Sequence, residues 1–301
     1  MDYSFLCGIC LPIPFRIFLT ICYGLMTIFG GIGNVISIIS IRKKNRNPNN
    51  RDEIDEILLS LAVCDALVSI TVYTVYPWLN FWNFGPFDSF LMRTFAVLLL
   101  SMTSTSSLTI IMLAVIKYLK ISKQNIFDDL ITEKRLCVAI ILSWLIPMLM
   151  LAPYLIYKEM VWTINAIAFS FTATTTISLP ILYFLILYVF KKSRRRVNDT
   201  AHSVAQQESN NQSTKRISKK LVQRSLWLIG AYLACTSLAI ISYTLYSAGV
   251  IKHGYFYQVT NVFFLGNSCA NPCIYMYKDK KFRKIAIKLL QTSQGTSDWE
   301  N

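Results

Sequence analysis

The sequence predicts an all-α membrane protein, a seven-transmembrane helix bundle with a short amphipathic helix after the seventh helix. Of its 301 residues 54% are hydrophobic and only 15% are charged, whereas soluble domains are roughly 45–50% apolar. About seven apolar runs are long enough to span a bilayer, which takes roughly 20 residues. Basic residues gather in alternate connections between these runs, as the positive-inside rule requires of a multi-pass protein.

The apolar runs give the expected spans. They are Phe15–Ile41, Ile54–Asn80, Phe90–Ile121, Leu136–Tyr157, Ala166–Phe190, Leu221–Tyr246 and Tyr255–Tyr277. The fifth is the least apolar, because residues 162–176 are rich in Thr, Ser and Asn.

Lysine and arginine set the expected orientation. They cluster at residues 42–46, 120–135, 191–220 and 278–284, whereas the alternate loops carry about one basic residue each. The positive-inside rule therefore places these clusters in the cytoplasm. The same distribution explains most of the +14 net charge, so we expect no nucleic-acid partner.

The expected organisation has three parts. Residues 1–14 form an extracellular tail, residues 15–277 the seven-helix domain with a cytoplasmic loop at 191–220, and residues 278–301 an amphipathic helix and cytoplasmic tail. Phe282, Ile285 and Leu289 follow helical spacing among lysines, which predicts a helix lying on membrane lipids of the inner leaflet. Because the first tail is short, a ligand is expected to enter among the helices or to contact short loops.

The cysteines and histidines predict no metal centre. Six of the eight cysteines lie in apolar runs and are expected to be small buried hydrophobes. Cys7 and Cys10 alone make a poor zinc site. His202 and His253 fall on opposite sides of the predicted membrane, and no constellation typical of an enzyme is present.

A polar segment interrupts the last apolar run, at Asn267-Ser268-Cys-Ala-Asn271-Pro272-Cys-Ile-Tyr275. A bilayer offers no water for these groups, so they must face protein or trapped water. Pro272 lacks an amide hydrogen and frees a carbonyl one turn earlier, near Ser268. We expect a hinge whose free carbonyl is satisfied by Asn267, Ser268 and Asn271.

Asp65 is the carboxylate placed deepest in an apolar run. An ionisable group at that depth is costly, so a functional role is the default interpretation. A purely structural hydrogen-bond acceptor is the alternative.

Taken in chain order, these features resemble the rhodopsin-like (class A) G-protein-coupled receptors. The marks are Gly33-Asn34, Asp65 after Leu61, Trp82-Asn-Phe84-Gly85, Trp144 with Pro147 and Pro153, Pro180 with Tyr188, and Asn271-Pro272-x-x-Tyr275. The resemblance runs from about Ile28 to Leu290. It implies a plasma-membrane receptor, with its N-terminus outside, that passes the signal of an extracellular ligand to a heterotrimeric G protein.

The resemblance implies two sets of residues inside the bundle. A sodium and activation pocket would consist of Asn34, Asp65, Ser106, Asn267, Ser268 and Asn271. One carboxylate with several neutral oxygens suits a monovalent cation with waters, and Na⁺ is the one cofactor implied. An activation switch would consist of Lys117, Tyr118, Tyr188, Tyr232, Pro272 and Tyr275, with Tyr188 and Tyr275 meeting on activation.

Several positions depart from the family. The Asp-Arg-Tyr of the third helix is Ile116-Lys117-Tyr118 here, and lysine lacks the forked donors of arginine. Ser218 stands near the place of the acidic partner at the foot of the sixth helix. The charge pair that restrains the resting state is therefore expected to be absent, which leaves raised basal activity and weakened coupling as open outcomes.

The sixth helix departs as well. The family's Cys-Trp-x-Pro is Cys235-Thr236-Ser237-Leu238, and Tyr232 replaces a phenylalanine. A smaller bend and a different trigger are expected. The extracellular disulfide is expected to be absent too, because no cysteine lies near Met92 or within Ala152–Phe171.

The ligand is expected to be neither an amine nor retinal. Leu99 stands where amine receptors carry aspartate, and Leu265 stands near the lysine position of opsins. The expected cavity, for a neutral lipid-like or small peptide ligand, is lined by Leu99, Thr103, Thr172, Thr176, Tyr243, Tyr257 and Asn261. Helix packing is the alternative role for each of them.

Two other functions fit parts of the sequence. The altered motifs at Lys117 and Thr236 fit a receptor-fold protein that binds a partner or acts as a decoy without coupling. A transporter or channel would use Asp65 along an ion path, but the paired repeats with broken helices typical of transporters are not evident.

Overall fold

The computed structural model describes residues 12–45, 53–81, 90–122, 127, 129–201, 227, 229–245, 248–250, 254–278 and 283–288, and every regular element in these ranges is helical. The long helices are α1 (Ile13–Asn45), α2 (Glu53–Phe81), α3 (Phe90–Ser122), α5 (Glu133–Leu151), α6 (Val161–Ala201) and α8 (Gly254–Lys278). Two 3₁₀ turns, η4 (Ala152–Leu155) and η5 (Lys158–Met160), join α5 to α6. A further helix spans Ile229–Leu245, called helix 229–245 below.

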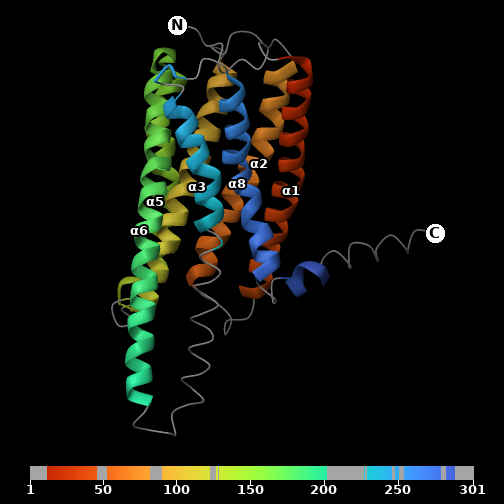
Figure 1. Ribbon diagram of the computed structural model, residues 1–301. Coiled ribbons are helices and arrows are strands. Elements are labelled where there is room, and N and C mark those ends of the chain that lie inside the picture. The colour runs from red at the N-terminus through yellow and green to blue at the C-terminus, as the bar shows by residue number, and fades with distance from the viewer. Residues whose placement is uncertain are drawn as a thin grey trace, which may run out of the picture.

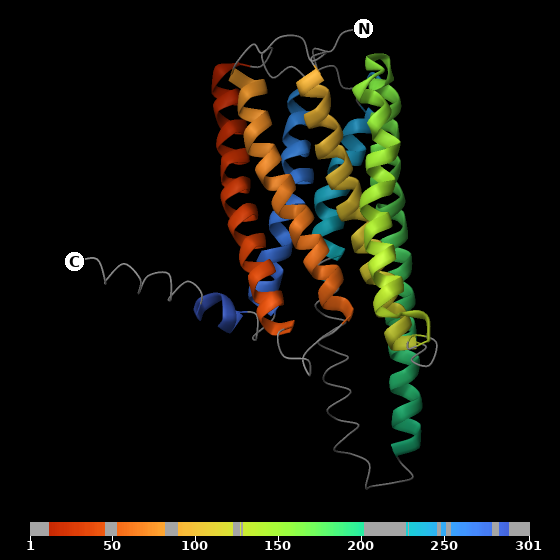
Figure 2. The same cartoon turned by 180° about the vertical axis from the view of Figure 1, so that it is seen from behind.

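The helices run side by side as one bundle (Figures 1 and 2). Within the described residues, four helical segments are long and apolar enough to cross a membrane: Ile13–Asn45, Arg93–Lys120, Glu133–Leu155 and Thr163–Val189. Helix 229–245 is apolar but shorter. Large hydrophobic side chains such as Phe29 and Leu149 are mostly exposed on the outside, as expected where lipid replaces water. The predicted all-helical membrane bundle is confirmed in this form.

Buried clusters hold the two ends of the bundle together. We call the end where α1 finishes and α2 begins the basic end, because Arg42, Lys43 and Lys44 lie in the last turn of α1. The cluster at this end includes Ile41, Ile57, Leu113, Tyr275 and Ala286. The cluster at the opposite end includes Leu19, Tyr23, Val68, Val72 and Leu265.

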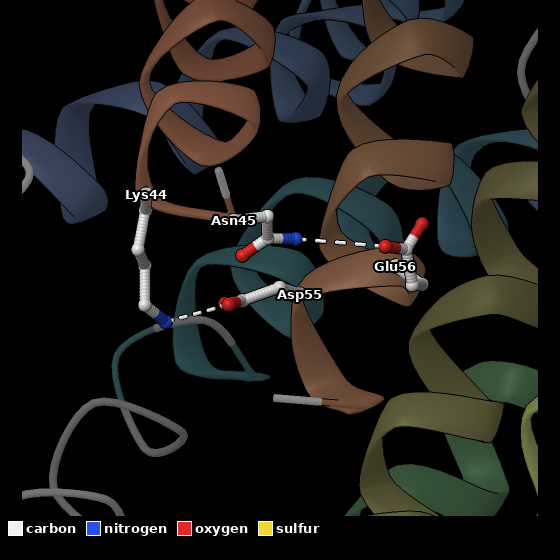
Figure 3. Close-up of polar contacts among 4 residues, drawn as sticks. All are labelled: Lys44, Asn45, Asp55 and Glu56. Carbon is white, nitrogen blue, oxygen red and sulfur yellow. Dashed lines mark hydrogen bonds and ion pairs between the residues drawn. The ribbon is translucent and has the colours of Figure 1, made fainter. Parts of the chain in front are cut away.

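An ion pair joins α1 to α2 at the basic end (Figure 3). Lys44 Nζ lies 2.6 Å from Asp55 Oδ2, with exposed side-chain fractions of 33% and 8%. Beside it, Asn45 Nδ2 points at Glu56 Oε1 at 3.5 Å, at the outer limit for a hydrogen bond. The polar pair thus fixes where the two helices meet.

Glycines bring α1 close to α8. A Cβ added at Gly33 would lie 2.9 Å from both Cβ and Cγ of Pro272, and one at Gly30 would lie 2.9 Å from Cys269 Sγ. Real Cβ atoms do not approach other atoms this closely, so only glycine permits the contact. The approach also carries Asn34, one residue further along α1, to the hinge of α8.

The structure differs from the predicted boundaries after the third span. Helix α5 ends at Leu151, because Pro153 opens the 3₁₀ turn that follows and cannot continue the α-helical hydrogen bonds. Helix α6 continues to Ala201, beyond the predicted start of the cytoplasmic loop at residue 191. No proline or glycine interrupts residues 181–201, so a helix already formed can propagate through them.

Only part of the predicted amphipathic helix is described. Residues 283–288 are helical, and Ala286 is buried in the cluster of the basic end. Phe282 and Leu289 lie outside the described residues. So do the tail at 1–11, the Trp82–Gly85 motif, Ser218 and Tyr246.

Candidate functional site

Asp65 occupies the centre of the bundle and is fully buried. Its Oδ1 accepts hydrogen bonds from Ser106 Oγ of α3 at 3.2 Å and from Ser268 Oγ of α8 at 3.0 Å. Its Oδ2 accepts from Asn271 Nδ2 at 2.6 Å. A buried carboxylate requires such donors, and here they tie α2, α3 and α8 to one side chain.

Asn34 satisfies the hinge of α8. Because Pro272 has no amide hydrogen, the carbonyl of Ser268, four residues earlier, lacks its helical donor. Asn34 Nδ2 donates to that carbonyl at 2.9 Å and to the carbonyl of Gly30 at 2.8 Å. The sequence-based expectation, that residues of α8 itself would satisfy the carbonyl, is corrected: the donor comes from α1.

Asn267 lies beside the residues that donate hydrogen bonds to Asp65 and is not one of those donors in the structure. It is buried and lines a cavity of about 10 Å³ together with Ser106 and Ser268. Ser107 and Tyr232 line the same cavity. This volume is close to the minimum that holds one water molecule. The cavity therefore leaves room for about one water between the cluster around Asp65 and a second polar cluster that contains Ser107 and Tyr232.

The second polar cluster joins helix 229–245 to α3 and α6. Tyr232 Oη and Ser107 Oγ share a hydrogen bond of 3.0 Å. Thr236 Oγ1 donates to the carbonyl of Tyr232 at 2.8 Å and lies 3.3 Å from Thr176 Oγ1. We call Ser107, Tyr232, Thr236 and Thr176 the hydroxyl cluster. Two of its members, Tyr232 and Thr236, are the positions at which the resemblance implies a phenylalanine and a tryptophan.

A larger cavity of about 110 Å³ lies among α3, α6, helix 229–245 and α8. Its lining residues are Leu100, Thr103, Asn165, Ala168, Phe169, Thr172, Ala239, Ile240, Tyr243, Thr260, Asn261 and Phe264. None of these described residues is acidic or basic. Phe169 and Tyr243 stack across it, with ring centroids 4.7 Å apart. The lining therefore offers aromatic surface, hydroxyls and two amides.

Four of the seven residues predicted for this cavity line it, namely Thr103, Thr172, Tyr243 and Asn261. Leu99 instead packs against the cluster of Leu19 and Tyr23, and Thr176 lies in the hydroxyl cluster. The Tyr257 side chain lies outside the described part. Asn165 was missed, although an amide within a membrane helix is itself a signal of a polar site.

Lys117 is buried near the basic end, at 5% exposure. It lines a cavity of about 20 Å³ with Leu61, Ile110, Leu113, Ala114, Ile186, Ile229 and Asn271. Asn271 therefore belongs both to this cavity and to the shell of Asp65.

The remaining switch residues occupy different environments. Tyr118 packs against the cluster of Ile110 and Tyr232. Tyr275 is buried at 1% exposure, whereas Tyr188 on α6 is 57% exposed. Their predicted meeting on activation therefore concerns a rearrangement and not this structure. Among the described residues no group of three or more His, Cys, Asp or Glu side chains could hold a metal.

The helical bundle, its polar centre and its cavity are consistent with one known protein family. Residues 33–275 match the model of the seven-transmembrane receptors of the rhodopsin family. The match spans most of the chain, so the protein belongs to this family and is a class A G-protein-coupled receptor. The predicted resemblance is thereby confirmed. A comparison with curated proteins gives no match.

Proposed function

We propose that the protein sits in the plasma membrane with its N-terminus outside and passes the signal of an extracellular ligand to a heterotrimeric G protein. The observation that carries this proposal is a connected series of polar groups along the bundle. The larger cavity contains Thr103, which also lines the small cavity beside Ser106. Ser106 contacts Asp65, and Asn271 extends from Asp65 to the cavity of Lys117.

The proposed ligand is neutral, with an apolar body and a few hydrogen-bonding groups. The uncharged lining around Phe169, Tyr243 and Asn261 supports this class, because a buried charge would need a partner. The test is a screen of neutral lipids and short uncharged peptides on cells that express the protein, repeated with Thr103→Trp. Loss of every response in the variant at equal surface expression supports the site. An unchanged response would exclude the cavity as the ligand site.

The proposed trigger is the hydroxyl cluster. Its four residues, Ser107, Tyr232, Thr236 and Thr176, join three helices through hydrogen bonds, where the family uses aromatic packing and a proline kink. Ligand binding in the cavity above would bias one of two packings of these helices. Tyr232→Phe removes only the hydroxyl and is expected to raise basal activity. Tyr154→Phe, at another buried tyrosine, is the control.

Na⁺ is the proposed regulator of the resting state. Asp65, Ser106 and Ser268 supply a carboxylate and two hydroxyl oxygens, and Asn267 supplies an amide at the adjoining cavity. These donors suit a monovalent cation. When bound, the ion would neutralise Asp65 and hold α2, α3 and α8 together. Asp65→Asn is expected to remove any dependence of basal activity on Na⁺, with K⁺ as the reference cation; a dependence that survives the substitution would refute the site.

The proposed contact with the G protein is the basic end, with Lys117 in the role of the family's arginine. Its test is guanine-nucleotide exchange on a panel of G proteins, measured with the unchanged protein and with Ile116→Asp combined with Lys117→Arg. Exchange by the unchanged protein supports coupling. If both reach the cell surface and neither promotes exchange, coupling is refuted.

A receptor-fold binding protein that does not couple is the second candidate. It is favoured by Ile116, which is 3% exposed at the position where the family's carboxylate would stand. In that case the variant with restored charges would gain exchange activity that the unchanged protein lacks.

A further inference from the structure

Two aromatic rings meet at the basic end of the bundle, between helix 229–245 and α8. Trp227 lies two residues before Ile229, and Tyr277 lies in the last turn of α8. Their ring centroids are 6.5 Å apart and their planes are at 79°, the edge-to-face geometry that aromatic pairs prefer. Figure 1 shows the two helices side by side, helix 229–245 in cyan and α8 in blue.

The contact lies on the outside of the bundle. Trp227 is 51% exposed and Tyr277 is 68% exposed, so neither ring belongs to the packed core. Between helices surrounded by lipid the hydrophobic effect contributes little, and direct contacts between side chains decide how closely two helix ends stay together. The pair can therefore set the spacing of these two ends, and it can separate without leaving a cavity in the core.

Residues next to the two rings reach the interior of the basic end. Tyr275, two residues before Tyr277, is only 1% exposed, so the two tyrosines leave α8 in different directions. Ile229, two residues after Trp227, lines the cavity that contains Lys117. A movement of this end of helix 229–245 away from α8 would therefore separate the rings and open the cavity of Lys117 together.

We propose that Trp227 and Tyr277 form an aromatic latch that holds the basic end of helix 229–245 against α8 in the resting state. Ile116 stands where the family carries a restraining carboxylate, and the latch restrains a different pair of helices by a contact without charge. An edge-to-face pair changes an equilibrium about two- to tenfold, so the latch limits opening without preventing it. The inference rests on the proposed function, because release of the latch would expose the basic end to a G protein.

The first test is amide hydrogen exchange of the full-length protein, read by mass spectrometry on peptides that cover residues 229–235. Trp227→Ala and Tyr277→Ala should each raise the exchange rate of these amides about two- to tenfold. The double alanine variant should raise it no further, because either substitution already removes the pair. Trp227→Phe and Tyr277→Phe keep a ring at each position and should stay near the unchanged rate. An effect of Trp227→Ala alone, or additive effects of the two alanine substitutions, would overturn the latch.

The second test is basal guanine-nucleotide exchange by the same variants at equal expression. Both alanine variants should raise the rate about two- to tenfold, whereas the phenylalanine variants should not. Phe184→Ala, which removes a 69% exposed ring from α6, is the control in both tests and should change neither rate. Faster amide exchange without faster nucleotide exchange, in a protein whose unchanged form is active, would refute the latch as a restraint on coupling. If no form promotes nucleotide exchange, the proposed function fails, and amide exchange alone decides whether the rings hold the two helices together.

Discussion

Asp65 is the residue on which the packing of three helices depends. Asp65→Ala would leave Ser106, Ser268 and Asn271 without their common acceptor, and each buried group left unsatisfied costs about 1–3 kcal/mol. We expect a clear loss in melting temperature of the purified protein. Asp65→Asn should lose less, because its amide oxygen still accepts from the hydroxyls and Asn271 can turn its own amide. Equal losses in the two variants would show that hydrogen bonding is not the reason.

Gly33 sets the distance between α1 and α8. In Gly33→Ala the new methyl group would lie 2.9 Å from two atoms of the Pro272 ring, which cannot move aside as a flexible side chain would. We expect a destabilisation of about 1–3 kcal/mol, typical of overpacking, measured as a fall in melting temperature. The matched control is Gly31→Ala, since nothing lies within 4 Å of its added Cβ. Equal melting temperatures for the two variants would contradict the close approach.

At the scale of elements, the pair of Lys44 and Asp55 holds the ends of α1 and α2 (Figure 3). Lys44→Met removes the cation beside a carboxylate that is only 8% exposed. We expect a loss of about 1–2 kcal/mol in the free energy of unfolding, between the values for exposed and buried pairs. The double variant with Asp55→Asn should recover most of that loss, because the uncompensated charge is gone. A double variant less stable than Lys44→Met would show that Asp55 stabilises through other contacts.

The sequence predicts the elements better than it predicts their rotation. The polar residues at 65, 106, 268 and 271 were grouped because the resemblance to the receptor family implies a shared pocket, and the structure joins them around one carboxylate. The rotation of α3 about its axis decides whether Leu99 or Leu100 faces the cavity. That rotation is set by side-chain packing between helices, so the sequence pattern predicted Leu99 where the structure has Leu100. Asn34 was expected in the pocket. Its hydrogen bond to the hinge of α8 was not predicted, because that bond depends on the close approach of α1 to α8 at Gly33.

The length of α6 was also not predicted from the sequence. The end of α6 could not be predicted from hydropathy, because helix propagation into Lys191 and beyond depends on backbone hydrogen bonds and not on apolar side chains. The hydroxyl cluster was only partly foreseen. Tyr232 and Thr236 were recognised as departures from the family. Their hydrogen bonds to Ser107 and Thr176 were not predicted, because these residues lie on three different helices whose packing the sequence does not specify.

For the whole molecule, the charge distribution predicts a single orientation in the membrane. An epitope tag before Met1 should be labelled on intact cells, and a tag after Asn301 only after permeabilisation. Replacing Arg42, Lys43 and Lys44 with glutamine should increase the inverted fraction, because positive charge favours the retention of a connection in the cytoplasm. An N-terminal tag that is labelled only in permeabilised cells would reverse the proposed orientation.

The proposed function depends on coupling to a G protein through the basic end. The most direct measurement is guanine-nucleotide exchange by purified G proteins in membranes that contain the protein, compared with membranes that contain Lys117→Ala at the same level. We expect measurable basal exchange, because Ile116 replaces the restraining carboxylate, and a severalfold lower rate in the variant. A rate that is indistinguishable from protein-free membranes for every G protein tested, or one that Lys117→Ala leaves unchanged, would contradict it.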